Sequence, residues 1–307
     1  NIFNSYSLFF ISADDNASIS KSFSGIKTNN TNSFSIAWIV NSFSIRLRDS
    51  LNKLFLSSCE DGISNINIFS TEDDIKLGQD LDTQIKNSPQ EYPIYNNTEW
   101  QNYVNGIKDE ILKSQHIEYK GKFPYKMTLI NSKTVNAFAT PGGYIYIYTG
   151  LLKFIDNEAT LAAFIAHEIA HAERRHATKR MTKQYGVSLM LDIVLGTNPD
   201  KMTEIGTNLL TGLGLLWNSR EDEYEADEYS FKYLQTSKYY AGASKLFFEK
   251  IGNASQSSLE ELLSTHPMDQ KRIDAINKLV NDNKIPALSE SNLFANKYSQ
   301  MKQLLPN

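Results

Sequence analysis

The chain has 307 residues, and its 31 basic and 35 acidic side chains give a formal net charge of −4. This near-balance argues against a nucleic-acid-binding protein, which normally carries a basic excess or a basic stripe. Hydrophobic residues make up 41% of the chain and charged residues 21%, a composition typical of globular rather than disordered proteins. A single cysteine excludes a disulfide framework and a zinc site built from several cysteines.

Residues 1–44 show neither a helical nor a strand period, and we expect residues 1–58 to be a leader or an extension outside the main domain. Near the end of this segment, basic residues and a short apolar stretch at 54–56 precede Cys59. This order resembles the end of a bacterial lipoprotein signal, although the usual apolar run is longer, about 7–15 residues. It predicts a protein of the bacterial periplasm, associated peripherally with the outer membrane through lipidated Cys59. The alternative is a buried free cysteine in an ordinary helix.

We expect residues 59–307 to form one mainly helical domain of the α+β class. A helical N-terminal part at about 70–120 precedes a core at about 124–285, in which a period of two marks three short strands. The expected elements are helices beginning near Thr71 and Glu99, strands at 127–130, 135–139 and 144–149, a turn at 140–143, and helices over most of the chain after Gly150.

Two apolar segments, 187–195 and 209–217, follow in the helical part. Both are shorter than the roughly 18–20 residues needed to span a bilayer. We expect them to be core helices or a hydrophobic flap beside a cleft.

A metal-binding pattern, HExxH, lies in a helix for which Asp156 is the expected N-cap. His167 and His171 are four residues apart, so they lie one turn apart on the same helix face and can hold one metal ion. Glu168 projects near that face and can reach a metal-bound water. A chance match on an amphipathic helix is the alternative, although the chain has only 5 histidines.

Zinc in a hydrolytic site takes three protein ligands and keeps one position open. His176 falls one residue short of the metzincin spacing, and we expect it to be an ordinary polar residue in a continuing helix. Glu223 and Asp227 offer another solution, because two acids four apart allow one to bind zinc while the other hydrogen-bonds a ligand histidine. The alternative for this stretch is an acidic, solvated helix face.

These motifs together resemble the zinc peptidases that include HtpX and the CAAX prenyl proteases, peptidase family M48. Two further stretches, 136–152 and 264–273, resemble its soluble bacterial branch, and the matching motifs span about residues 70–280. The resemblance implies a gluzincin-type peptidase in which a small sheet presents an edge strand to the active-site cleft. It also implies one Zn²⁺ per chain and a set of roles: His167, His171 and Glu223 as ligands, Glu168 as the base, and Asp227 as the partner that orients a histidine.

The expected substrate is an unfolded or extended polypeptide, which fits a role in the quality control of misfolded envelope proteins. We expect it to add to the sheet along the edge strand formed by Asn136, Ala137, Phe138 and Ala139. The alternative for this stretch is a plain hairpin that supports the core.

The oxyanion needs a hydrogen-bond donor, for which His266 and Arg272 are the candidates and Tyr224 a weaker one. Because Pro267 follows it, His266 is expected in an extended loop. It can instead fill the fourth metal position and hold the enzyme latent, or merely pack beside the C-terminal helix.

A second class of function is a chaperone-like binding module, or a zinc-stabilised scaffold without turnover. The presence of Glu168 together with every proposed ligand favours the enzyme.

Overall fold

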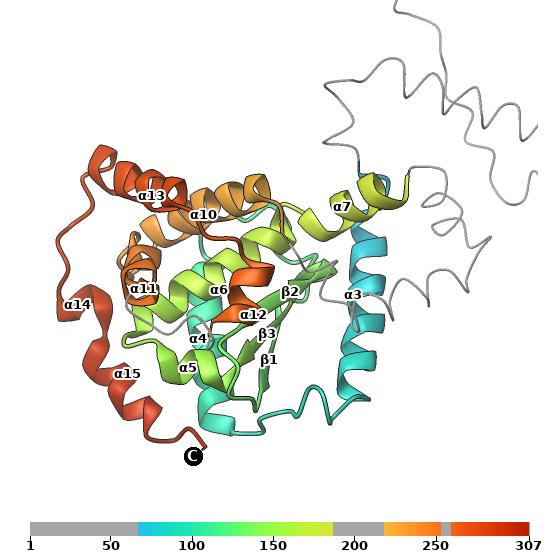
Figure 1. Ribbon diagram of the computed structural model, residues 1–307, viewed down its shortest axis with the longest axis horizontal. Helices are drawn as coiled ribbons and strands as arrows, with labels where there is room; N and C mark the ends of the chain where they lie inside the picture. Colours follow the sequence, from blue (N-terminus) through green and yellow to red (C-terminus); the bar gives the residue numbers. More distant parts are fainter. Residues whose placement is uncertain (1–66, 187–217, 253–258, 307) are drawn as a thin grey trace, which may run out of the picture. The chain divides into compact units, whose positions relative to one another are not determined.

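The computed structural model describes residues 67–186, 218–252 and 259–306. In this part of the chain, helices surround one small three-stranded sheet (Figure 1), which confirms the predicted mainly helical α+β class. None of the helices in these ranges is long and apolar enough to cross a lipid bilayer. The predicted leader with Cys59 and the apolar segments 187–195 and 209–217 lie outside the described residues.

The two N-terminal helices begin at side-chain caps. Helix α3 (Thr71–Lys86) has Ser70 as its N-cap in a reciprocal capping box with Asp73, and three acids occupy its first turn, where they suit the positive end of the helix dipole. Helix α4 (Thr98–Ile111) begins where Asn97 accepts a hydrogen bond from the backbone N–H of Trp100 at 2.9 Å. Both helices were predicted, within a few residues at each end.

The sheet has the strand order β1-β3-β2, which leaves β2 at an edge. Strand β3 pairs parallel with β1 and antiparallel with β2, and the 3₁₀ turn η2 joins β2 to β3. In η2, Gly142 has a φ of 73°, and a Cβ there would lie 2.8 Å from the Ile75 Cα of α3, so the close approach requires glycine. The bounds are Lys126–Ile130 for β1, Ala137–Thr140 for β2, Pro141–Gly143 for η2 and Tyr144–Tyr148 for β3.

Strand β3 separates two parts of the core, because its side chains alternate between the faces of the sheet. Tyr144, Tyr146 and Tyr148 pack with Ile85 of α3 on one face. The isoleucines between them, at 145 and 147, pack with α4 and with α6 (Glu158–Glu173) on the other face. Helix α6 therefore lies inside the domain with helices and sheet around it (Figure 1).

The start of α6 differs from the prediction in its cap. Asn157, not Asp156, is the N-cap: its side-chain oxygen accepts the backbone N–H of Thr160 at 2.8 Å. Asp156 instead pairs with Lys250 of α11 (Ala243–Ile251). The prediction was wrong because two adjacent residues can both cap, and a distant lysine selects between them.

The predicted continuation of this helix through His176 is also wrong. Helix α6 ends at Glu173, Arg175 adopts a left-handed φ of 56°, and His176 begins a new helix, α7 (His176–Tyr185). The Arg175 guanidinium donates to Asp74 and to the Phe69 carbonyl at the start of α3. These hydrogen bonds offset the cost of a left-handed conformation in a non-glycine residue.

Helix α10 lies across α6 and carries the acidic motif, with its start fixed by a capping box between Ser219 and Asp222. His266 follows α12 with φ −125° and ψ 82°, so it lies outside the helix, as Pro267 predicts. A short α5 follows β3, and α14 and α15 pack back on α6 near the C-terminus (Figure 1). The bounds are Thr149–Phe154 for α5, Arg220–Gln235 for α10, Glu260–Thr265 for α12, Gln270–Asp282 for α13, Glu290–Leu293 for α14 and Ala295–Lys302 for α15.

Candidate metal centre

Four buried side chains from three places in the chain meet beside α6. His167 and His171 project from α6, Glu223 from α10, and His266 from the loop after α12. One ligand atom from each lies within 4.8 Å of the other three. The structure therefore brings together the three predicted metal ligands and adds His266 to them.

The spacing of these atoms suits a tetrahedral ion. The Nε2 atoms of His167 and His171 are 3.0 Å apart, and Glu223 Oε1 lies 3.2 Å from His171 Nε2 and 3.1 Å from His266 Nδ1. Bonds of about 2.0–2.1 Å to a tetrahedral ion place neighbouring ligand atoms about 3.3 Å apart. The residues present thus fit a zinc-sized ion in both donor type and separation.

The electrostatics of the cluster also favour a cation. Burial lowers the pKa of His167, but the carboxylates of Glu223 and Asp227 outweigh this and raise it to about 10. Burial holds the pKa of His171 well below its ordinary value, so this imidazole is neutral, the form that binds a metal. The two carboxylates therefore attract positive charge to the cluster, which a proton or a metal ion can supply.

Asp227 and Arg272 hold the cluster from the α13 side. Asp227 Oδ1 lies 3.1 Å from His167 Nδ1, the arrangement expected of a carboxylate that orients a ligand histidine. The Arg272 guanidinium donates to both oxygens of Asp227, at 2.6 and 2.8 Å, and lies 2.6 Å from Glu223 Oε2. Arg272 thus positions carboxylates here, while its role as an oxyanion donor stays a prediction.

A second series of hydrogen bonds starts at His171 and fixes the orientation of its ring. The sequence analysis did not predict it. The Nδ1 atoms of His171 and His176 are 2.7 Å apart, and His176 Nε2 lies 3.0 Å from Glu225 Oε2. With His171 Nε2 free to bind a metal, its Nδ1–H donates to His176, whose Nε2–H donates to Glu225. Arg174 donates to the other oxygen of Glu225 at 2.8 Å. His176 is therefore buried beside the site without being one of its ligands.

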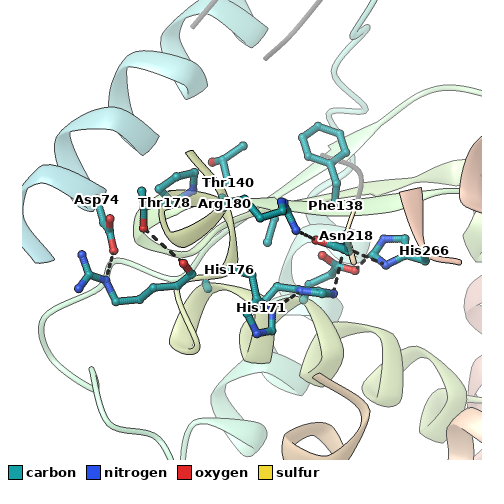
Figure 2. A pocket seen from close by; sticks show the side chains of 15 residues that line it. Asp74, Phe138, Thr140, His171, His176, Thr178, Arg180, Asn218 and His266 are labelled. Atoms are coloured by element: carbon teal, nitrogen blue, oxygen red, sulfur yellow. Dashed lines mark hydrogen bonds and ion pairs between the residues drawn. The ribbon is translucent and has the colours of Figure 1, made fainter. Parts of the chain in front are cut away.

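Asn218 is another residue that the sequence analysis did not find. Figure 2 shows it in the hollow that His171, His176 and His266 also line. Its amide Nδ2 lies 3.2 Å from His171 Nε2 and 3.4 Å from His266 Nδ1, and its side-chain oxygen accepts from Arg180. An N–H donor thus points at the ligand cluster. The available signal was the place of Asn218 directly before the capping box of α10.

Glu168 lies next to the cluster with an unsatisfied oxygen. The residue is only 1% exposed, and among the described residues its Oε1 has no hydrogen-bond partner; His266 Nε2 is 3.5 Å away. Burial raises the pKa of Glu168 above the usual glutamate value, although the charges of His266 and His167 oppose the shift. A buried carboxylate with a raised pKa is suited to proton transfer.

The edge strand β2 borders the same cluster. Ala137 O accepts a hydrogen bond from His266 Nε2 at 3.2 Å, and the backbone N–H of Ala139 faces Glu168. Asn136 and Phe138 point their backbone groups at β3 instead. Tyr224, the weaker oxyanion candidate, donates its hydroxyl to Asp269 at 2.6 Å. The predicted edge strand thus borders the site, and the backbone carbonyl of Ala137 and N–H of Ala139 face the cluster.

Two histidines one helical turn apart, a glutamate from a second helix and an adjacent buried carboxylate are the parts of a metallopeptidase site. Comparison with known proteins gives the family. The model for peptidase family M48 matches residues 99–280, more than half of the chain, and this range contains the whole cluster. The chain belongs to peptidase family M48, as the sequence motifs predicted.

Curated relatives agree with this assignment. A beta-barrel assembly-enhancing protease of Escherichia coli (strain K12) is 28% identical over 229 residues, which are 71% of this chain and 46% of that protein. The mitochondrial metalloendopeptidase OMA1 of Arabidopsis thaliana is 32% identical over 149 residues, 48% of this chain and 30% of that protein. OMA1 of Saccharomyces cerevisiae is 30% identical over 183 residues, 57% of this chain and 52% of that protein. The chain thus spans about half the length of the curated relatives it matches, and HtpX and the CAAX prenyl proteases are a neighbouring branch.

Proposed function

We propose that this chain is a zinc-dependent metalloendopeptidase that hydrolyses peptide bonds and holds one Zn²⁺ through His167, His171 and Glu223. The observation that carries the proposal is the buried Glu168 carboxylate, one oxygen of which has no hydrogen-bond partner among the described residues, beside four ligand atoms that lie within 4.8 Å of one another. When bound, zinc supplies Lewis-acid chemistry that polarises a carbonyl and acidifies water. Membership of a peptidase family supports the same chemistry.

The other residues of the site orient the ligand histidines and transfer protons. Glu168 takes a proton from the attacking water and delivers it to the leaving amine. Asp227 and His176 each hold one ligand histidine in the tautomer that leaves Nε2 free, and Arg272 keeps Asp227 in place.

The substrate is an extended polypeptide that adds as a strand to the free edge of β2. The Ala137 carbonyl and the Ala139 N–H face away from β3 and toward the site, so they can pair with a substrate backbone. Backbone pairing tolerates many sequences, which suits unfolded or misassembled chains as substrates.

His266 holds the enzyme in a latent form. Its Nδ1 takes the fourth place in the cluster, and its Nε2 occupies the Ala137 carbonyl that a substrate strand needs. One side chain therefore blocks both the open metal position and the strand edge, and activity requires that His266 withdraws.

Asn218 then supplies the oxyanion donor, because its Nδ2 lies 3.4 Å from the place that His266 Nδ1 now occupies. Asn218→Ala should lower kcat by about 10²–10³-fold while zinc is retained, which steady-state kinetics with metal analysis can check. Unchanged kcat would leave the donor role to Arg272.

The test of the function is Glu168→Gln, which keeps the side-chain shape and every ligand but removes the base. We expect retained zinc and a rate of casein hydrolysis lower by at least about 100-fold. Glu228→Gln, on the exposed face of α10, is the control and should resemble wild type. Near-normal turnover by Glu168→Gln would contradict the mechanism. A His266→Ala chain that holds zinc and binds casein without cleaving it would favour the chaperone-like alternative.

We further propose a place in the bacterial periplasm, in the quality control of envelope proteins, with a lipid on Cys59 that anchors the chain to the outer membrane. The name of the Escherichia coli relative, which refers to beta-barrel assembly, supports this place. Intact-mass measurement of protein expressed in a bacterial host with its native upstream sequence checks the anchor. An unmodified Cys59 thiol with residues still attached before it would contradict it.

A further inference from the structure

Arg180 of α7 reaches the edge of the ligand cluster through Asn218, a residue 38 positions later in the chain. Figure 2 shows these two side chains joined by a hydrogen bond in the hollow that His171 also lines. Arg180 cannot be a metal ligand, because a guanidinium group has hydrogen-bond donors and no acceptor. Its place beside the cluster therefore needs another explanation.

The guanidinium of Arg180 determines which end of the Asn218 amide faces the cluster. Arg180 Nη1 donates to the side-chain oxygen of Asn218 at 2.5 Å. Since arginine only donates, the oxygen of the amide has to face it. The NH₂ group of the same amide then points the other way, where Nδ2 lies 3.2 Å from His171 Nε2 and 3.4 Å from His266 Nδ1.

The reversed amide would be a poor neighbour for the reaction. With the amide of Asn218 turned over, its NH₂ group would face the Arg180 guanidinium, donor against donor, and its oxygen would face the cluster. An oxygen there would repel the negative charge that develops on the substrate carbonyl in the transition state, whereas an N–H stabilises that charge. The orientation of this amide thus decides whether Asn218 can act as the oxyanion donor.

Arg180 is itself fixed from the start of α10. The same Nη1 atom lies 3.0 Å from Asp222 Oδ2, so its two N–H bonds are shared between Asn218 and Asp222. Asp222 also accepts the Ser219 backbone N–H in the capping box of α10. The side chains of Arg180 and Asp222 are only 19% and 17% exposed, so the pair is mostly shielded from water. The guanidinium is therefore a firm support for the amide.

The backbone of Asn218 is held on the opposite side. Its N–H donates to the Thr265 carbonyl at 3.1 Å, directly before His266. The freedom that this bond leaves to Asn218 is rotation about the bonds of its side chain, and the hydrogen bond to Arg180 restricts that rotation. A donor that is already in place costs no reorganisation at the moment of reaction.

We infer that Arg180 is a positioning residue for catalysis: its guanidinium holds the Asn218 amide with the N–H toward the oxyanion. This inference rests on the proposed peptidase function and on Asn218 as its oxyanion donor. It adds a residue that acts on the reaction only through Asn218.

The experiment is a double-mutant cycle in zinc-loaded His266→Ala as the parent chain, where the place beside Asn218 is open. Arg180→Met keeps an unbranched side chain but removes every donor. It should lower kcat for a casein-derived peptide by about 10–100-fold with little change in KM, because a misplaced catalytic group costs up to about that much. In a parent that also carries Asn218→Ala, Arg180→Met should have almost no further effect, since nothing is left to orient.

The control is Lys183→Met, which removes an exposed basic side chain from the same helix and should leave kcat unchanged. Arg180→Lys guards against a folding defect, because it keeps a cation beside Asp222. Its loss of kcat should be smaller than that of Arg180→Met and should likewise disappear without Asn218.

Binding measured without turnover gives a second readout. A phosphinic peptide, in which a tetrahedral phosphinate replaces the scissile amide, resembles the transition state and should bind Arg180→Met about 10–100-fold more weakly than the parent. Zinc affinity, measured by competition with a chelator, should equal that of the parent.

Unchanged kcat in Arg180→Met, or an equal loss with and without Asn218, would overturn the role of Arg180 while the peptidase function stands. Unchanged affinity for the phosphinic peptide would overturn it as well. A parent chain that holds zinc but cleaves no peptide would overturn the peptidase function itself, and this inference with it.

Discussion

Helix α6 buries a glutamate in its first turn and another within its HExxH motif, and the surroundings of these two carboxylates are opposite in kind. Glu158, in the first turn, is 1% exposed and accepts hydrogen bonds from the hydroxyls of Tyr103 and Tyr239, both at 2.7 Å. Lys297 of α15 lies 2.8 Å from the same carboxylate. These partners come from separate parts of the chain, so a satisfied carboxylate ties α4, α6 and α15 together.

Glu168, between the two ligand histidines of α6, is equally buried but has an oxygen without a hydrogen-bond partner among the described residues. Its neighbours are three histidines and a second carboxylate, whose ligand atoms lie within 4.8 Å of one another. A buried carboxylate oxygen without a hydrogen bond lowers the free energy of unfolding. Such a group in a native structure therefore needs an explanation other than stability, for example a role in catalysis. The contrast separates a buried acid that stabilises the fold from one that serves a reaction.

The largest effect that tests this contrast is expected at His266, the side chain nearest the unpaired oxygen. Replacing His266 with alanine should raise proteolytic activity, by about tenfold or more if fewer than about one in ten wild-type molecules are open. Casein hydrolysis at equal zinc occupancy is the measurement. A fall of about 10²–10³-fold would instead make His266 the oxyanion donor, and unchanged activity would leave it a packing role.

A second effect, on zinc affinity rather than on activity, is expected at His176, which touches a ligand but not the metal position. His176→Ala removes the acceptor for His171 Nδ1–H and should weaken zinc binding by about 10–100-fold without unfolding the chain. Competition with a chromophoric chelator measures this affinity, and circular dichroism checks the fold. The matched control is His116→Ala, at a half-buried histidine in a turn outside the cluster, and it should leave zinc affinity unchanged. Wild-type affinity in His176→Ala would show that His171 needs no such support.

The sequence predicts those features of the site that lie within a single helix, and it does not predict those that arise from contacts between distant elements. The spacing of His167 and His171 is a property of one helix, and the pair Glu223 and Asp227 is a property of another, so both patterns were visible before any fold was known. Their meeting was inferred from the family resemblance, because the packing of α10 on α6 depends on the whole core.

The errors came from contacts between distant parts of the chain. His176 reaches His171 only because Arg175 turns left-handed, and Arg175 is held there by Asp74, a residue 101 positions earlier. Asp156 lost the capping position to its neighbour because Lys250, 94 positions later, engages it. A local pattern does not contain either contact, so the sequence predicted a longer helix and the wrong cap.

The smallest expected effect lies at the satisfied end of α6 and concerns stability. Burial alone would raise the pKa of Glu158, but Lys297 and the two tyrosine hydroxyls outweigh it and lower the pKa below its ordinary value of 4.5. A depressed folded-state pKa contributes stability that is fully present above about pH 4.5 and is lost as the pH falls through the folded value.

Glu158→Gln should therefore destabilise the chain at pH 7 by roughly 1–3 kcal/mol, the usual range for a lost hydrogen bond to a charged group. The difference from wild type should shrink below about pH 4.5. Urea unfolding at both pH values checks this, with exposed Glu228→Gln as the control. A pH-independent difference would show that the charge of Glu158 is not what stabilises this end of α6.

Zinc content of the purified chain is the most direct test of the central claim, that the cluster beside Glu168 on α6 is a metal site. Elemental analysis by inductively coupled plasma mass spectrometry should find one zinc per wild-type chain, and one in the control Glu228→Gln at an exposed position. It should find almost none in His171→Ala or Glu223→Gln. One zinc per chain in His171→Ala would contradict the account, because the ion would then be held by residues other than this cluster.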